Sequence, residues 1–291
     1  MKIIEKFKAK KPVIAFEIFP PKPDVPIDSL FGHLEQFEAL KPDYISVTYG
    51  AGGSQKGRTL EIASRIKEIN HLESMAHFTC VGHLKEEIDR MLISMSRQGL
   101  KNVLALRGDP PADRPDFDFS KNVYRYASEL IDHIRRSGDF CIAAAAYVEG
   151  HVDSKKLSED IFHLKEKVDA GVDFLVTQLF FDNRLFYDFI EKARRSGIDC
   201  PVAAGIMPVF KADQIKSIAA KSGCSIPAKL VLMMDKYQDN AEDMRRAGIE
   251  YAALQIRDLI DNGADGIHLY TMNRPKSTAE IMKGADILLS S

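Results

Sequence analysis

Short apolar segments alternate with helical segments eight times along this chain of 291 residues, and the repeat limits the folds that the chain can adopt. The apolar segments are rich in β-branched and aromatic residues, as strands are. They begin at Val13, Tyr44, Met75, Asn102, Cys141, Asp173, Val202 and Gly266. Successive starts lie roughly 30 residues apart, the span of one βα unit, except for a last interval of about 64. The repeat predicts an α/β fold, a (β/α)8 TIM barrel with extra helices between strands 7 and 8.

Amphipathic patterns fill the intervals and predict the helices. They cover residues 28–40, 58–69, 84–97, 123–135, 154–170, 184–195, 211–221, 226–237, 242–262 and 277–289. Asp28 is a suitable N-cap for the first of these helices. The turn signals, such as Pro20-Pro21 and Pro110-Pro111, are too short to be interdomain linkers. We therefore expect a single catalytic barrel domain over residues 1–291.

Charge and cysteine usage exclude several classes of function. Lys plus Arg number 40 and Asp plus Glu 42, so a net charge of -2 gives no reason to expect nucleic-acid or membrane-surface binding. No apolar run reaches the length of a membrane span, and the first residues lack the apolar region of a signal peptide. Cys80, Cys141, Cys200 and Cys224 form no C-x-x-C pair and no metal-spaced cluster. We expect reduced thiols, a cytoplasmic setting and no metal site. Arg135 and the other paired arginines are typical of solvated helix ends.

One carboxylate, Glu17, lies inside the otherwise apolar first strand segment, V-I-A-F-E-I-F at 13–19. A strand this apolar is covered on both faces in a parallel sheet. Burial disfavours the charged carboxylate, so we expect the pKa of Glu17 to be raised. A Glu held neutral near pH 7 can donate a proton to a reacting atom. A Glu paired with a nearby Arg or Lys in a structural role is the alternative, and this segment alone does not decide between the two.

Active sites of TIM barrels lie at the carboxyl ends of the strands. Polar or titratable residues end most of the predicted strands, namely Glu17, Thr48, His77, Asp109, Tyr147, Gln178 and Arg274. Together they predict a binding mouth with hydrogen-bond donors, acceptors and an acid. The small residues 143–146 before Tyr147 leave room for a large planar cofactor, with a ring to stack on it, although ordinary barrel packing also alternates small and large residues. Gly108 allows close approach of the backbone.

The segment G-G-S-Q-K-G-R-T at 52–59 resembles the phosphate-binding loop G-x-x-x-x-G-K-[ST]. Arg58 stands where that loop has its Lys, and no strand-ending Asp for magnesium lies nearby. We interpret the segment as a glycine-rich turn between a strand and a helix. The chain also has no G-x-G-x-x-G fingerprint, so a nicotinamide nucleotide would have to bind without that motif.

A series of motifs along nearly the whole chain resembles the methylenetetrahydrofolate reductase family. They are F-E-I-F-P-P at 16–21, S-V-T-Y-G-A at 46–51, H-F-T-C at 77–80, L-R-G-D-P-P at 106–111, A-A-Y-V-E-G-H at 145–151, K-V-D-A-G-V-D at 167–173, T-Q-L-F-F-D at 177–182, G-I-M-P-V at 205–209 and Y-T-M-N-R at 270–274. Any one motif alone is weak, but their common order is specific. The length matches the short bacterial form, which has the catalytic barrel alone.

The resemblance implies a flavoprotein oxidoreductase of one-carbon metabolism and methionine biosynthesis, with FAD in the barrel mouth. NADH or NADPH would reduce the flavin and leave, and 5,10-methylenetetrahydrofolate would then take the hydride and become 5-methyltetrahydrofolate. Glu17 matches the family's general acid, which protonates the folate nitrogen as the five-membered ring opens, and Asp109 matches the acid that holds the pterin. Gln178, Gln214 and Arg274 match further folate contacts, although Gln214 alone could be a solvated helical residue.

The family's FAD contacts match Thr48, Tyr49, Ala51, His77, Arg107, Gly108, Asp109, Tyr126, Ala127, Tyr147, His151, Asp160 and Lys167. Val148 and His163 stand where the family has Pro and Asn, which affects local cofactor contacts and not the chemistry. The sequence does not decide whether the electron donor is NADH, NADPH or a partner protein. It also does not decide whether the protein forms a homo-oligomer, although relatives commonly self-associate. Two other functions compete, a pterin-binding barrel methyltransferase without flavin and a nucleotide-binding module that uses the loop at 52–59.

Overall fold

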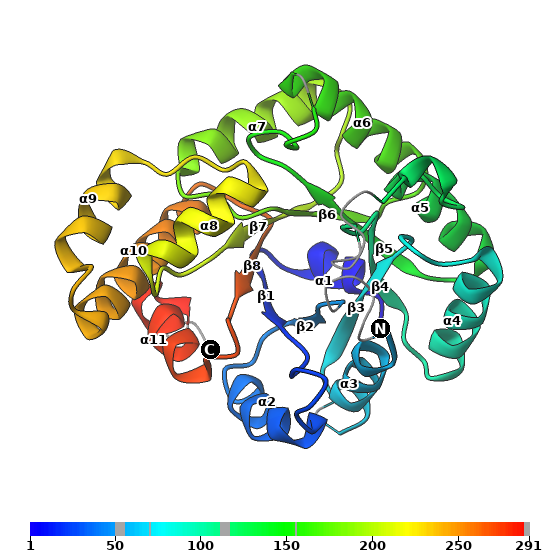
Figure 1. Ribbon diagram of the computed structural model, residues 1–291, viewed down its shortest axis with the longest axis horizontal. Helices are drawn as coiled ribbons and strands as arrows, with labels where there is room; N and C mark the ends of the chain where they lie inside the picture. Colours follow the sequence, from blue (N-terminus) through cyan, green and yellow to red (C-terminus); the bar gives the residue numbers. More distant parts are fainter. Residues whose placement is uncertain (50–55, 70, 111–116, 155, 288–291) are drawn as a thin grey trace.

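The computed structural model describes residues 1–49, 56–69, 71–110, 117–154 and 156–287. Within them the strands form a closed barrel in chain order, and Figure 1 looks into this barrel. The strands are β1 (Val13–Ile18), β2 (Tyr44–Val47), β3 (Glu73–Thr79), β4 (Asn102–Leu106), β5 (Cys141–Ala146), β6 (Phe174–Thr177), β7 (Val202–Ile206) and β8 (Gly266–Tyr270). Each strand pairs in parallel with the next, and β8 pairs in parallel with β1. The predicted (β/α)8 TIM barrel is confirmed.

Helices surround the barrel on its outer side (Figure 1). They are α2 (Phe31–Glu38), α3 (Lys56–Ile69), α4 (Lys85–Arg97), α5 (Ala127–Ser137), α6 (Leu157–Asp169), α7 (Asn183–Arg195), α8 (Ala212–Ser222), α9 (Ala228–Tyr237), α10 (Ala241–Asp261) and α11 (Pro275–Gly284). Helices α9 and α10 confirm the predicted insertion between β7 and β8. No described helix has the length and apolar character that crossing a membrane requires.

Three predicted helix starts are wrong by three or more residues, and local hydrogen bonds explain one of them. Helix α6 begins at Leu157 and not at Ser154. Asp28 does not cap a helix but lies within a short 3-10 helix (Ile27–Leu30) that precedes α2. Helix α5 begins at Ala127 and not at Val123. The Glu129 carboxylate accepts a hydrogen bond from the backbone N–H of Tyr126 at 3.1 Å, which caps the helix at this point.

Helix α1 (Ile3–Ala9), which the sequence analysis did not predict, closes the bottom of the barrel, where the strands begin. Figure 1 shows it within the ring of strands. Its Ile3 and Phe7 are buried, and the Phe7 ring centroid lies 5.0 Å from that of Phe174 inside the barrel. A helix this short is unstable in isolation, so its stability comes from the apolar barrel floor that it covers.

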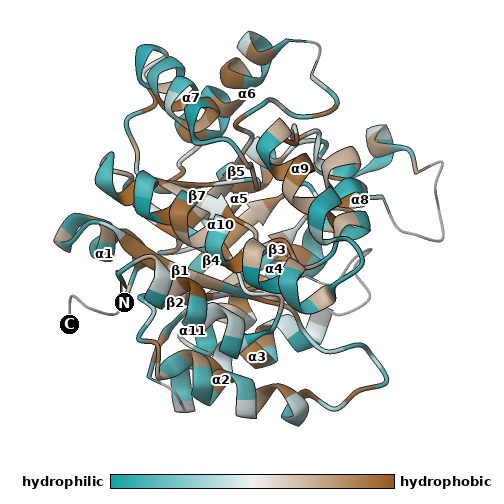
Figure 2. Cartoon of the chain, turned by 90° about the vertical axis from the view of Figure 1, so that its left-hand side faces the viewer, coloured by the Kyte–Doolittle hydropathy of each residue, from teal (hydrophilic) through white to brown (hydrophobic). Residues whose placement is uncertain are grey.

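The core has an inner and an outer part. The outer part packs the helices against the sheet, and the coloured cartoon shows hydrophobic strands with hydrophilic residues on the outer helices (Figure 2). The inner part fills the lower barrel with side chains such as Tyr44, Met75, Leu104 and Phe174. Because successive residues of a strand alternate between faces, the inward positions near the upper ends of the strands carry the side chains of the site.

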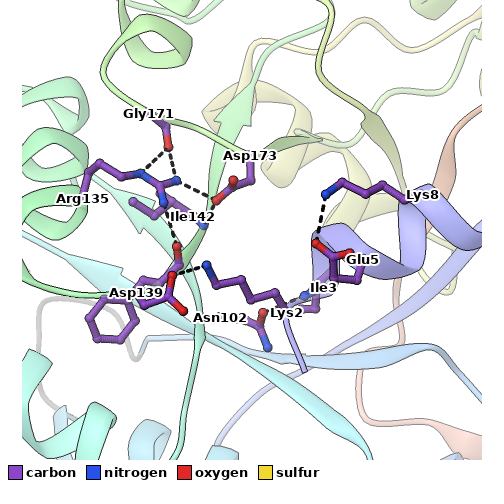
Figure 3. Close-up of polar contacts among 11 residues, drawn as sticks. Lys2, Ile3, Glu5, Lys8, Asn102, Arg135, Asp139, Ile142, Gly171 and Asp173 are labelled. Carbon is purple, nitrogen blue, oxygen red and sulfur yellow. Dashed lines mark hydrogen bonds and ion pairs between the residues drawn. The ribbon is translucent and has the colours of Figure 1, made fainter.

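A carboxylate and an arginine tie the bottom ends of β5 and β6 to α5 (Figure 3). The Asp173 carboxylate accepts a hydrogen bond from Ile142 N at 2.7 Å, and the Arg135 guanidinium donates to Asp173 at 2.7 Å and to Phe140 O at 2.9 Å. Arg135 also donates to the carbonyl of Gly171. The prediction of a merely solvated helix end at Arg135 is therefore wrong, because the guanidinium pairs with these oxygens.

Candidate active site

A cavity of about 590 Å³ opens at the carboxyl ends of the strands, where the site was expected. Its walls combine apolar side chains from β4 to β7 with the polar residues that the sequence analysis singled out. The predicted residues that line it are Glu17, Thr48, Tyr49, His77, Arg107, Gly108, Asp109, Tyr147, His151 and Gln178. The structure thus brings together side chains that lie up to 161 positions apart in the sequence, from β1 to the end of β6.

A second cavity, of about 620 Å³, lies over α5 and α6 and adjoins the first. Its lining includes Arg107, Tyr126, Ala127, Tyr147, His151, Asp160 and Lys167 from the predicted set. Arg107, Tyr147 and His151 belong to both linings. The two cavities therefore form one elongated site that runs from the barrel mouth across β4 and β5 to the helices outside.

Glu17 is buried at the bottom of the first cavity, between two imidazoles. Its Oε2 lies 2.9 Å from Nε2 of His268 and 3.4 Å from Nε2 of His77, and Nε2 of His77 lies 2.8 Å from the hydroxyl of Ser46. Among the described residues, no hydrogen bond is formed by Oε1 of Glu17, although the side chain lines the cavity. This oxygen is the one placed to meet a ligand.

The predicted rise in the pKa of Glu17 is wrong. Burial does act to raise this pKa, but the hydrogen bonds from His268 and His77, helped by their charge, outweigh burial and lower it to about 2. The alternative reading, a Glu paired with Arg or Lys, is not what the structure shows either, since both partners are histidines.

Residues after β8 fix the backbone on either side of the Glu17 side chain. The carbonyl of Glu17 accepts hydrogen bonds from Thr271 Oγ1 at 2.7 Å and from Thr271 N at 3.2 Å. The Asn273 amide accepts from Phe19 N at 2.9 Å and donates to Phe19 O at 2.8 Å. Met272 and Asn273 both have positive φ, 53°, in the left-handed region that residues other than glycine rarely adopt. Strain of this kind is characteristic of functional sites.

Lys167 and Asp160 are two of the charged residues that line the second cavity, together with Arg107, Glu129, Asp153, Glu159 and Glu166. The Lys167 ammonium donates to Ala145 O at 2.7 Å, and burial lowers the pKa of Lys167 to about 8. The Asp160 carboxylate accepts from His151 N at 3.2 Å and from Ser154 Oγ at 3.0 Å, which fixes the loop after β5. The buried Lys167 ammonium, with Arg107 as a second cation of the same lining, suits an anionic ligand group.

Gly108 and Thr79 shape the wall where β3 and β4 end. Gly108 has φ +90°, and a Cβ there would lie 2.5 Å from Val81 Cγ1, so only glycine fits. The hydroxyl of Thr79 is buried in the same lining without a hydrogen-bond partner among the described residues. An unpaired polar atom in a cavity wall is costly unless a ligand or water satisfies it.

Two predicted residues that the structure describes fall outside both linings. Gln214 lies on α8 one turn before Ile218, which does line the first cavity, so both are on the same helix face. The exposed Arg274 guanidinium stacks over the Phe210 ring, 4.4 Å from its centroid, at the outer rim. Ala51 lies outside the described residues.

The described part of the segment 52–59, residues 56–59, is the first turn of α3, so the predicted turn before this helix falls on residues outside the description. Residues 52–55 lie outside the description, and α3 begins at Lys56. The Arg58 guanidinium donates to backbone carbonyls of the loop after β1, at 2.7 Å to Lys22 O and 2.6 Å to Pro23 O. It is therefore engaged with the protein itself and does not stand in for a phosphate-binding Lys.

Sequence reasoning missed His268, Thr271 and Asn273, although signals for them exist. His268 and Tyr270 alternate on one strand, so once Tyr270 is placed in the cavity, His268 must also point into the barrel. The positive φ of Asn273 leaves no comparable signal, because a single Asn in a loop is common and does not by itself indicate this backbone conformation.

The chain matches the family model described as methylenetetrahydrofolate reductase over residues 2–286. It is 35% identical over 303 residues to methylenetetrahydrofolate reductase (NADH) 1 of Arabidopsis thaliana, covering 99% of this chain and 51% of the relative. It is 33% identical over 270 residues to 5,10-methylenetetrahydrofolate reductase of Escherichia coli (strain K12), covering 92% of this chain and 88% of the relative. The chain thus spans about half the length of its plant relatives.

A solved structure of an uncharacterized protein from Clostridium thermocellum, which binds two copies of 5-methyl-5,6,7,8-tetrahydrofolic acid, has a similar fold. The TM-score is 0.70 with 15% sequence identity, and the match covers 99% of each chain. At this identity the likeness concerns the fold alone.

Proposed function

The chain belongs to the methylenetetrahydrofolate reductase family, and on this premise we propose that it reduces 5,10-methylenetetrahydrofolate to 5-methyltetrahydrofolate with FAD as its cofactor and NADH or NADPH as the electron source. The observation that carries the proposal is the buried Glu17 facing a cavity at the barrel mouth, joined to a second cavity that holds a cation. The first suits a reacting pterin and the second an anionic cofactor tail.

The residues present fit FAD. The two joined cavities, of about 590 and 620 Å³, offer separate room for a flat ring system and a nucleotide end, and the Lys167 ammonium in the second would attract a diphosphate. The unpaired Thr79 hydroxyl and the side-chain-free Gly108 stand where a flat ring with polar edges would be received. When bound, FAD would supply a two-electron carrier between the nicotinamide and the folate, which no side chain provides.

The chain's own residues would bind the folate and manage its proton. We assign Glu17 as the general acid that protonates the folate nitrogen when the five-membered ring opens, through Oε1. The two histidines keep its carboxyl ionised in the free protein, so we propose that Oε1 takes up a proton from solvent as the folate enters and desolvates the carboxylate further. Asp109 is exposed at the rim of the same cavity and would hold the pterin, and Gln178 would hydrogen-bond either substrate in turn. Gln214 and Arg274, at the outer rim, would contact the part of the folate that projects from the barrel.

Absorbance spectroscopy of the purified protein tests this proposal. A yellow flavoprotein should lose its flavin absorbance with NADH or NADPH and regain it when 5,10-methylenetetrahydrofolate is added. Glu17→Gln should leave the bleaching intact and slow the recovery by at least about 100-fold, because the acid acts only on the folate. Recovery at the normal rate in Glu17→Gln would show that the assigned role is wrong.

The same experiment separates the competing functions. A colourless protein that binds pterins would favour the methyltransferase, and stabilisation by ATP without an effect of FAD would favour the nucleotide-binding module. Failure of both nucleotides to bleach a yellow protein would point to electrons supplied by a partner protein. We also propose a single catalytic domain and a cytoplasmic location, supported by four free cysteines. We also propose that the protein forms a homo-oligomer, which a measurement of its molecular mass in solution would test.

A further inference from the structure

The general acid proposed above receives its position mainly from β8. Strand β8 pairs with β1 in register, with Glu17 beside Tyr270 and Ala15 beside His268. The Thr271 and Asn273 hydrogen bonds then hold the backbone of residues 17 and 19. What remains to be fixed is the side chain of Glu17, which has three rotatable bonds.

His268 is the contact that fixes this side chain. Its side chain is 0% exposed, so packing holds the ring, and its Nε2 lies 2.9 Å from Oε2 of Glu17. Its Nδ1 is buried without a hydrogen-bond partner among the described residues. A buried N–H without a partner is costly, so the proton of a neutral ring belongs on Nε2, where it is donated to Oε2. The ring thus engages one carboxylate oxygen and leaves Oε1 for the cavity.

We propose that His268 is the positioning residue of the general acid: it holds Oε2 of Glu17 inside the barrel so that Oε1 faces the folate nitrogen. This inference rests on the proposed function and adds to it a residue outside the cavity linings. His268 lies out of reach of the ligands and acts only through Glu17. Its effect is therefore confined to the folate half-reaction, the only step in which Glu17 transfers a proton.

The groups around Glu17 define what removal of the ring should do to its ionisation. His77 faces it from β3, Tyr270 from β8 and Tyr44 from β2, and all three remain in the chain when His268 is replaced. Burial acts to raise the pKa of Glu17, and His268 and His77 act to lower it. Loss of His268 removes one of the two opposing contacts, so the pKa of Glu17 must rise.

The test measures the two half-reactions separately, by stopped-flow absorbance on the FAD-bound protein over a range of pH. His268→Leu removes the hydrogen-bond donor, and His268→Gln keeps an amide N–H near the position of Nε2. In His268→Leu, flavin reduction by NADH or NADPH should stay within about threefold, while reoxidation by 5,10-methylenetetrahydrofolate should slow about 100-fold, as expected for a misplaced acid. The pH at which reoxidation falls off should move upward. His268→Gln should restore the rate to within about tenfold.

Tyr44→Phe is the matched control, because it alters a buried ring beside His268 whose hydroxyl has no partner among the described residues. Both half-reactions should be unchanged in it. If His268→Leu does not bind FAD, His268→Asn replaces it, since its shorter amide cannot reach Oε2. Normal reoxidation in the leucine variant, an unmoved pH limb, or equal loss in the glutamine variant would overturn the inference. Wild-type protein that 5,10-methylenetetrahydrofolate fails to reoxidise would instead refute the proposed function itself, and the inference with it.

Discussion

The Lys167 ammonium shows how one buried side chain makes ligand binding depend on pH. Burial lowers its pKa to about 8, so in the free protein it loses its charge as the pH rises through 8. A bound diphosphate favours the charged form, so FAD affinity should be constant below pH 8 and fall above it, by up to about tenfold per pH unit. Lys167→Met should bind FAD weakly and without this dependence.

Titration of the FAD-free protein with FAD, followed by quenching of flavin fluorescence, measures this dependence. Lys165→Met is the matched control, because Lys165 lies on the same helix and pairs with Asp169 outside both cavity linings. It should keep the wild-type pH profile. An affinity that is flat between pH 7 and 10 in the wild type would contradict the assignment of Lys167 to the diphosphate.

At the scale of single residues, the sequence predicts where Glu17 lies but not its pKa. Its burial and its place at the barrel mouth follow from the apolar run around it and from the strand period. Its low pKa does not, because the two histidines that cause it are 60 and 251 positions away. Which side chains meet inside a barrel depends on strand register, and register is set by the packing of the whole sheet.

At the scale of elements, the contact of α10 with the loop after β7 depends on Gly248 having no side chain. A Cβ on Gly248 would lie 1.8 Å from the carbonyl oxygen of Val209, a backbone atom that cannot turn aside. Gly248→Ala should therefore lower the free energy of unfolding by about 2 kcal/mol or more, as overpacking does. Urea denaturation followed by circular dichroism measures the change.

Gly32→Ala in α2 is the control, since nothing lies within 4 Å of the Cβ that it adds. Alanine favours the helix over glycine, so this variant should be unchanged or more stable by up to about 1 kcal/mol. Equal destabilisation by both substitutions would show that helix propensity, and not the contact with Val209, decides the effect.

The strands and most helices were predictable because their patterns are local, whereas α1 was not. All eight predicted strand starts and the inserted helices α9 and α10 rest on apolar periods within a single segment, and the structure places them within two residues of the expected position. Helix α1 has two inward residues, Ile3 and Phe7, and the helix is stabilised by packing these residues against the barrel floor. The sequence of its seven residues alone does not indicate the barrel floor that stabilises it, so the helix could not be predicted from local pattern.

The whole molecule divides into an end that binds and an end that stabilises, as is usual for this fold. The cavities open where the strands end, and α1 closes the barrel where they begin. Asn102, 1% exposed, joins α1 to the floor: its side chain accepts from Ile3 N at 2.8 Å (Figure 3) and donates to Ser74 O at 3.2 Å. Removing this side chain should affect stability and leave the site intact.

Asn102→Ala should lower the free energy of unfolding by about 2 to 3 kcal/mol, because it leaves the buried N–H of Ile3 without a partner. Both flavin half-reactions should stay within about twofold at 25 °C. Lys8→Ala, which removes only the exposed ion pair with Glu5 on the same helix, should cost less than about 0.5 kcal/mol. Urea midpoints and stopped-flow rates on the same preparations compare the two properties. Slowed half-reactions in folded Asn102→Ala protein would mean that the floor of the barrel is coupled to its mouth, contrary to the division proposed here.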